Sequence, residues 1–280
     1  MKNQVAVTGH NSGIGKFIVA NLEMYGQKVV KIGRKSSDLY FDLGDPDKLP
    51  DLVQVKYLVH VAWQRSNSSD YDFQVNISGS LAILAAAVKA GVTPILISSD
   101  SAELALSKYG EAKQIVENAF LKAQGHVIRC GIVWGGEIAG ILGTILNLSR
   151  LPVICPHLIP EPILRPTKLE EIVVSIMSII MDPPNPPELV SAGSSDRYSL
   201  SCISHELRGD RITLHIPVPL AFLYSAAKLL RAIGQKPPFD PDSLRSFMRK
   251  SKLDDLRLAQ YRETTQPFSQ GFLLWLRGVK

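Results

Sequence analysis

Residues 4–15 read Gln-Val-Ala-Val-Thr-Gly-His-Asn-Ser-Gly-Ile-Gly, a short apolar strand that runs directly into a glycine-rich turn. Apolar side chains then recur at helical spacing as far as Tyr25, so the turn lies between a strand and a helix. Glycines there let the backbone approach a pyrophosphate, which rests on the N–H groups at the helix N-terminus. The stretch therefore predicts a dinucleotide site with these cofactor-binding residues: Gly9, Asn11, Ser12, Gly13, Ile14 and Gly15.

The rest of the N-terminal half continues the alternation of strand and helix. Further strands are expected at 28–32, 57–62, 94–98 and 126–131, with long helices at 70–90 and 107–123. This order predicts an α/β fold with a doubly wound, Rossmann-like parallel sheet. We expect an NAD(P)-binding domain over residues 1–160. A smaller, mostly helical substrate-binding region should follow over 161–280, with its 161–192 segment returning to the sheet.

Composition narrows the class of protein. Of 280 residues, 45% are hydrophobic and 20% are charged, which excludes a disordered chain or a small disulfide scaffold. Three cysteines without CxxC spacing favour a reducing compartment, and neither a secretory signal nor a membrane span is visible. These features predict a soluble, cytoplasmic protein. The last 53 residues hold eleven Lys or Arg against five Asp or Glu, which suits a phosphate-bearing ligand, anionic lipid or a solvated face.

The loop after the second strand bears on the choice of cofactor. NAD-specific folds place an acid there to bind the ribose 2′-hydroxyl, whereas an arginine accommodates the 2′-phosphate of NADP. This chain has Arg34 followed by Lys35, and no acid between Glu23 and Asp38. The loop predicts NADP, with NAD as the alternative. Asp42, further along, either accepts a hydrogen bond from the adenine amino group or is an ordinary loop acid.

The sharpest chemical signal is the pair Tyr109 and Lys113. A spacing of four places the phenol and the ammonium on one face of a helix, where a positive charge lowers the pKa of a tyrosine. Ser99 ends the preceding strand within a cluster of serines, and its hydroxyl could hold a substrate oxygen against the tyrosine. Asp100 follows it, either as a cap of the next turn or as an acid that helps to eliminate water.

Together these motifs resemble the short-chain dehydrogenase/reductase superfamily, specifically the extended NAD-dependent epimerase/dehydratase family. The resemblance covers roughly residues 4–192 and also includes segments 60–62, 75–79 and 129–135. It implies that Tyr109 is the general acid/base, that Lys113 binds the nicotinamide ribose, and that Ser99 bonds the substrate oxygen. Ser98 and Ser101 are neighbouring candidates for the serine role. The remaining cofactor contacts that it implies are with Asp42, Leu43 and Ala62.

The resemblance implies an NAD(P)-dependent oxidoreductase or epimerase that acts on a sugar nucleotide or a related carbonyl or hydroxyl compound. An alternative is a non-catalytic NADP-binding regulator or assembly subunit on the same fold. The histidines and cysteines show no metal-ligand spacing, and no nucleic-acid-binding motif occurs. Neither a metal ion nor a nucleic acid is therefore expected as a ligand. The apolar segment 217–233 predicts either a buried helix of the substrate-binding region or a membrane-surface helix, so peripheral contact with a membrane stays open. A homodimer is expected from the resemblance alone.

Overall fold

A computed structural model describes residues 3–64, 70–136, 141–150, 153–181, 184–193, 197–208, 214–235 and a few single positions beyond them. The chain forms two compact units. Unit 1 comprises residues 1–130 and 169–193, and unit 2 comprises residues 131–168 and 194–280. Residues 131–168 thus lie in unit 2, and residues 169–193 return to unit 1.

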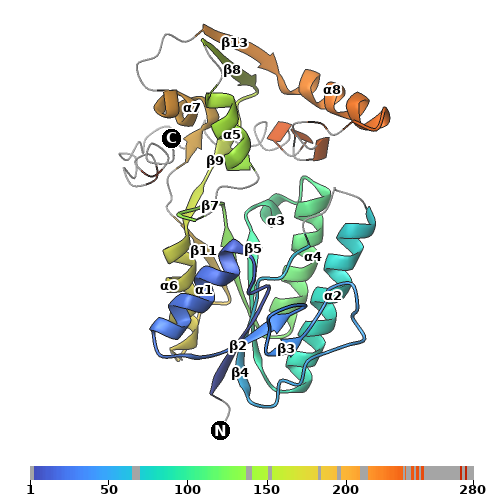
Figure 1. Cartoon of the computed structure of the whole chain (residues 1–280), viewed down its shortest axis with the longest axis vertical. Coiled ribbons are helices and arrows are strands. Elements are labelled where there is room, and N and C mark those ends of the chain that lie inside the picture. Colours follow the sequence, from blue (N-terminus) through green and yellow to red (C-terminus); the bar gives the residue numbers. More distant parts are fainter. Residues whose placement is uncertain are drawn as a thin grey trace. The chain divides into compact units, whose positions relative to one another are not determined.

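Unit 1 is built on a seven-stranded sheet in the order β11-β6-β5-β4-β1-β2-β3, and every pair in it is parallel (Figure 1). The α/β, doubly wound fold expected from the sequence is confirmed. The strand order reverses between β1 and β4, and ligands of such sheets bind at this switch point, beside the carboxyl ends of the strands. The strands are β1 (Gln4–Thr8), β2 (Lys28–Gly33), β3 (Leu39–Tyr40), β4 (Val55–His60), β5 (Thr93–Ser99), β6 (His126–Cys130) and β11 (Leu189–Ala192).

Helices cover both faces of this sheet. α1 (Gly13–Met24) packs beside α6 (Leu169–Ile180), and α2 (Asp70–Lys89) packs beside α4 (Lys108–Lys122), with the short α3 (Ser101–Leu104) before α4 (Figure 1). The strands are nearly continuous apolar runs because a parallel sheet is buried on both faces. Their side chains join those of α2 and α4 in two buried clusters, which include Leu58, Ile83, Leu96 and Phe120.

In its described segments up to residue 235, unit 2 contains three helices and three two-stranded sheets. The helices are α5 (Ile141–Ser149), α7 (Leu200–Arg208) and α8 (Leu220–Ala232). The sheets pair β7 (Ile132–Trp134) with β10 (Pro166–Lys168), β9 (Ile163–Leu164) with β12 (Tyr198–Ser199), and β8 (Ile154–Ile159) with β13 (Leu214–Pro219). One apolar cluster, with Tyr198 and Ile203 buried in it, forms the core of this unit.

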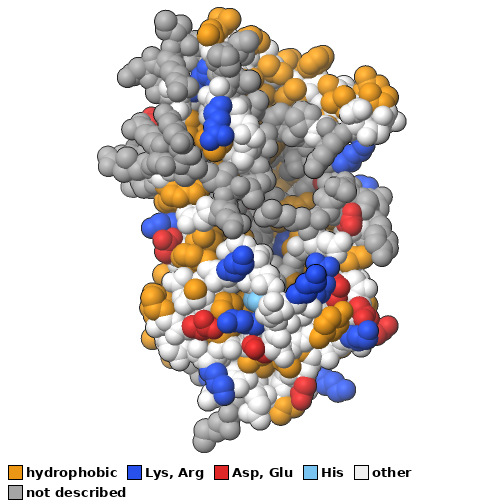
Figure 2. Space-filling view, in the orientation of Figure 1, with side chains coloured by type: hydrophobic (Ala, Val, Ile, Leu, Met, Phe, Trp, Pro, Cys, Tyr) orange, Lys and Arg blue, Asp and Glu red, His pale blue; other side chains and the backbone are white. Residues whose placement is uncertain are grey.

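The segment for which a peripheral membrane contact stays open contains α8, and most residues after it lie outside the described part of the chain. Phe222, Leu229 and Ile233 are exposed along one side of this segment, and hydrophobic side chains are visible over α8 in Figure 2. Among the described residues, no helix combines the length and the apolar character that crossing a bilayer requires.

Candidate active site

The glycine turn lies at the switch point, directly after β1. Gly9 has φ +67°, and a Cβ there would lie 2.8 Å from the backbone N and Cα of Ala62, at the end of β4. A Cβ on Gly15 would collide with the carbonyl oxygen of Gly9, whereas one on Gly13 would meet nothing within 4 Å. Gly9 and Gly15 therefore let the turn fold tightly against β4, while space is left open at Gly13.

The start of α1 suits the pyrophosphate of a dinucleotide. Ser12 is the N-cap residue, and its Oγ accepts a hydrogen bond from the Gly15 N–H at 3.0 Å. The N–H groups of a first helical turn and the helix dipole favour an anion at this end. Open space at Gly13 leaves room for one, so these residues fit the cofactor that the turn predicts.

Substituting alanine for Gly9 tests the close approach of this turn to β4. We expect Gly9→Ala to destabilise unit 1 by at least about 2 kcal/mol and to abolish dinucleotide binding, because the Cβ meets the Ala62 backbone at a strained φ. Gly26→Ala is the matched control, since Gly26 has φ +76° but nothing within 4 Å of its Cβ position. Urea unfolding of both variants measures the difference, and equal losses of stability would contradict this account.

A buried hydrogen-bond network joins β1 and β4 behind the turn. Thr8 Oγ1 accepts from the backbone N–H groups of Val61 and Ala62 at 3.1 and 3.2 Å, and it lies 2.8 Å from His60 Nδ1. The hydroxyl must therefore donate its own hydrogen to Nδ1, which leaves His60 Nε2 to donate to Ser80 Oγ at 2.9 Å. Burial, with the positive charge of Lys113, lowers the pKa of His60 to about 3, so the ring stays neutral.

The turn is also tied to the loop after β2. His10 is buried, and its ring nitrogens lie 3.1 Å from the Ile32 carbonyl oxygen and 3.0 Å from that of Ser36. The Asn11 side chain donates to the Lys35 carbonyl oxygen at 2.9 Å. Asn11, which the sequence predicts to bind the cofactor, thereby also holds the loop that carries Arg34.

Arg34, directly after β2, and Asp42, just after β3, bring their side chains together. Their nearest side-chain atoms are 3.9 Å apart, and Arg34 is the more exposed of the two. Asp42 Oδ1 also accepts from the Gly44 N–H at 3.0 Å. Leu43 is buried, and a Cβ on Gly79 of α2 would lie 2.6 Å from its Cα, so these residues are in close contact.

Ser99 and Tyr109 are brought into hydrogen-bond contact. Ser99 ends β5, and Tyr109 lies in the first turn of α4, which Ser107 caps through a 3.0 Å bond from the Gly110 N–H. Burial raises the pKa of Tyr109 to about 12, and a hydrogen bond with Ser99 lowers it by a smaller amount. The sequence predicted a lowered pKa; in the folded chain the cost of burying a phenolate outweighs the effects that favour it.

Lys113 is buried one helical turn after Tyr109. Its Nζ donates to the Ile97 carbonyl oxygen at 3.3 Å and lies 3.8 Å from the centre of the Trp63 ring. Burial lowers the pKa of Lys113 to about 7, against smaller raising effects of Cys130 and Glu117. The amine therefore exchanges its proton near neutral pH.

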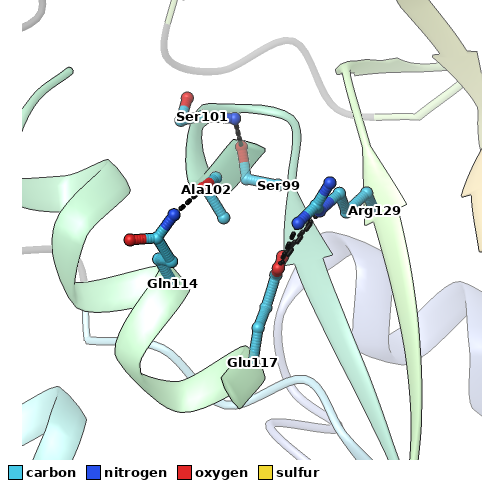
Figure 3. A network of polar contacts seen from close by, with 6 residues as sticks. All are labelled: Ser99, Ser101, Ala102, Gln114, Glu117 and Arg129. Carbon is cyan, nitrogen blue, oxygen red and sulfur yellow. Dashed lines mark hydrogen bonds and ion pairs between the residues drawn. The ribbon is translucent and has the colours of Figure 1, made fainter. Parts of the chain in front are cut away.

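An ion pair connects α4, the helix that carries these residues, to β6. Glu117 of α4 and Arg129 of β6 form a forked pair with distances of 2.8 to 3.2 Å, and the Glu117 side chain is 1% exposed (Figure 3). The Gln114 side chain donates to the Ala102 carbonyl oxygen at 3.1 Å, which ties α4 to α3. These contacts hold the helix that carries Tyr109 and Lys113.

Asp100 does not cap the following turn as expected. It occupies the N-cap position of α3 with helical dihedral angles, and its side chain makes no capping hydrogen bond. The Ser99 Oγ instead accepts the Ser101 N–H at 3.3 Å (Figure 3). The Ser98 Oγ, another candidate, is buried and makes no hydrogen bond.

The structure thus gathers the expected residues at one edge of unit 1. Ala62 contacts the glycine turn, and the adjacent Trp63 contacts both Tyr109 and Lys113. Neither Trp63 nor the network around His60 is among the site residues predicted from the sequence. Their signals are a tryptophan three residues after the end of β4 and a polar residue that ends β1. Within the described part of the chain, no group of three or more His, Cys, Asp or Glu residues could hold a metal ion.

Comparison with known proteins agrees with this arrangement. Residues 5–124 match the NAD dependent epimerase/dehydratase family, and this segment contains the glycine turn together with Ser99, Tyr109 and Lys113. No curated protein sequence matches the chain.

Several solved structures share the fold. UDP-glucose 4-epimerase of Thermotoga maritima, solved with UDP-glucose, is 19% identical, with a TM-score of 0.60 over 89% of this chain and 99% of that one. MoeE5 in complex with UDP-glucuronic acid and NAD is 18% identical, with a TM-score of 0.61 over 89% and 99%. TunA, an NAD-dependent NDP-hexosamine 5,6-dehydratase of tunicamycin biosynthesis, is 17% identical, with a TM-score of 0.59 over 89% and 97%. These structures show that the chain shares their fold, and the family match over residues 5–124 indicates an NAD-dependent enzyme.

Proposed function

We propose that this chain is an NAD(P)-dependent oxidoreductase or epimerase acting on a sugar nucleotide, because residues 5–124 match the NAD dependent epimerase/dehydratase family. The observation that carries the proposal is the hydrogen bond between Ser99 and Tyr109, one helical turn from a buried Lys113. A phenol, a hydroxyl and an amine are the groups that an oxidation or reduction at a C–O bond needs for its proton.

The cofactor would transfer the hydride, and residues of the chain would transfer the proton. A bound nicotinamide supplies or accepts the hydride. With a pKa of about 12, Tyr109 holds its proton at neutral pH and can donate it from Oη to a carbonyl oxygen that is being reduced. In the oxidation direction, Oη takes the proton of the substrate hydroxyl and gives up its own proton, for which the neutral amine of Lys113 is the acceptor. Lys113, with a pKa of about 7, can take up or release a proton in the same pH range.

The substrate class is supported by the similar structures and by the place of Asp100. Two of them were solved with UDP-sugars, and the third is named a dehydratase of an NDP-hexosamine. Asp100 follows Ser99 directly, where its carboxylate is a candidate for elimination chemistry. Oxidation, reduction and epimerisation need only Ser99, Tyr109, Lys113 and the cofactor.

We propose NADP as the preferred cofactor. Arg34 follows β2, where a dinucleotide's ribose lies in this fold, and its guanidinium is largely exposed at 3.9 Å from Asp42. Such a loose pair costs little to open, so the guanidinium is available to a 2′-phosphate. Asp42 is the acid beside it that would meet a 2′-hydroxyl, which makes NAD the alternative.

Titrating NADPH and NADH against the wild-type chain and two variants tests this proposal. We expect NADPH to bind more tightly than NADH, and Arg34→Ala to weaken NADPH by about tenfold or more while leaving NADH unchanged, since a charge-assisted hydrogen bond is worth roughly 1.5–3 kcal/mol. Lys35→Ala is the matched control, because it removes a neighbouring charge from the same loop. Preference for NADH would overturn the choice of NADP, and binding of neither would overturn the proposed function.

One observation favours a second candidate, a non-catalytic NADP-binding regulator or assembly subunit. Burial keeps the Tyr109 phenol protonated far above neutral pH, and the Lys113 ammonium faces an indole ring. A chain with this role would bind the dinucleotide without any dependence of its function on the Tyr109 hydroxyl. Phenylalanine at position 109 therefore separates the two candidates.

A further inference from the structure

Trp63 has a fixed backbone and a side chain that spans the proposed site. On one side of it, the Ala62 N–H donates to Thr8 Oγ1 at 3.2 Å. On the other side, Asn76 of α2 accepts from the Gln64 N–H at 2.6 Å and donates to the Gln64 carbonyl oxygen at 3.0 Å. With its backbone held from both ends, Trp63 can change position chiefly by rotating its side chain.

The indole lies against both candidate catalytic groups. Its ring centre is 3.8 Å from Lys113 Nζ, within the range of a strong cation–π contact, and 5.7 Å from the Tyr109 ring, which it meets edge to face at 86°. A buried ammonium needs partners for its N–H groups, and here the Ile97 carbonyl oxygen and the indole face are among them. An N–H directed at the ring cannot at the same time donate to a ligand hydroxyl.

We propose that Trp63 is a displaceable cap on Lys113: its indole covers the ammonium in the free chain and rotates away when the ribose hydroxyls of the cofactor take its place. The inference rests on the proposed function, since it assigns Lys113 to the cofactor. Trp63 then opposes cofactor binding and sets its affinity, without itself taking part in proton transfer.

Removing the indole should therefore strengthen binding. A desolvated cation–π contact is worth up to about 2 kcal/mol, so Trp63→Leu should tighten the Kd for the dinucleotide by roughly 3-fold to 30-fold. Trp63→Phe keeps a smaller aromatic face and should fall between wild type and Trp63→Leu. In a Lys113→Met background, Trp63→Leu should change the Kd by less than about 2-fold, because the contact that it removes is already gone.

These Kd values also separate the cap from the proposed function. Tighter binding of the dinucleotide by Trp63→Leu than by wild type supports the cap. Binding by Trp63→Leu when the wild-type protein binds no dinucleotide supports it as well. An equal or weaker affinity in Trp63→Leu, with wild type binding normally, would overturn the cap and leave the proposed function standing. Binding by neither protein would overturn both.

A second readout follows the indole directly and needs no turnover. The chain has three tryptophans, so protein labelled with 5-fluorotryptophan gives three fluorine NMR signals. The signal missing from Trp63→Phe belongs to Trp63. Lys113→Met should shift this signal in the free protein, and NADP⁺ should shift it in the wild-type protein in the same direction. A Trp63 signal that stays in place on saturation with NADP⁺ would overturn the proposal.

Discussion

Tyr109→Phe is expected to reduce turnover of a sugar nucleotide by roughly 10²–10⁴-fold, the usual contribution of a positioned general acid or base. The change removes only the hydroxyl that contacts Ser99, so the affinity for NADPH should stay within about 2-fold of wild type. Turnover is measured with the nucleoside diphosphate sugar that reacts fastest with the wild-type chain. Affinity is measured by the fluorescence of the bound dinucleotide.

Tyr25→Phe is the matched control for this experiment. Tyr25 is the C-cap residue of α1 and is more than half exposed, so the loss of its hydroxyl should leave turnover unchanged. Equal activity of wild type and Tyr109→Phe would remove Tyr109 from the reaction. If the chain's biological function also persisted in that variant, the non-catalytic regulator would become the better account.

The second prediction with a large expected effect concerns the ion pair between Glu117 and Arg129. Glu117→Ala should lower the free energy of unfolding by roughly 3–5 kcal/mol, because it leaves the mostly buried Arg129 guanidinium without its carboxylate partner. An arginine guanidinium keeps its proton at any ordinary pH, so the charge cannot be relieved by loss of a proton. Urea unfolding at neutral pH measures the loss.

Two further variants make that result specific. Glu111→Ala removes an exposed carboxylate from the same helix and should cost less than about 1 kcal/mol. The double variant Glu117→Ala/Arg129→Met should recover part of the stability lost by Glu117→Ala, because no unpaired charge then remains. A loss in Glu117→Ala no larger than in Glu111→Ala would contradict the structural role of the pair.

Much of the fold could be predicted because it depends on local patterns. The strand expected at 94–98 is β5 at Thr93–Ser99, and the helix expected at 107–123 is α4 at Lys108–Lys122. Both follow from apolar periodicity and from a serine at the helix start. The glycine turn could be placed for the same reason, since a strand and an amphipathic helix flank it.

The details of the site depend on contacts between residues far apart in the chain, which no local pattern contains. His10 bonds two carbonyl groups more than 20 residues away, and Trp63 covers a lysine 50 positions later. The direction of the Tyr109 pKa was mispredicted because the spacing to Lys113 indicates proximity but not burial. The cap expected from Asp100 does not form, because this residue has helical dihedral angles, whereas a capping side chain reaches the first turn from an extended backbone.

The most direct test of the central claim is hydride transfer from a sugar nucleotide to the cofactor held by this chain. Wild-type protein saturated with NADP⁺, and separately with NAD⁺, is mixed with a panel of nucleoside diphosphate sugars, and the absorbance of reduced nicotinamide is followed in a single turnover. The account predicts a signal with at least one of these sugars, and its loss in Tyr109→Phe. Tight binding of the dinucleotide without reduction by any sugar nucleotide in the panel would contradict it.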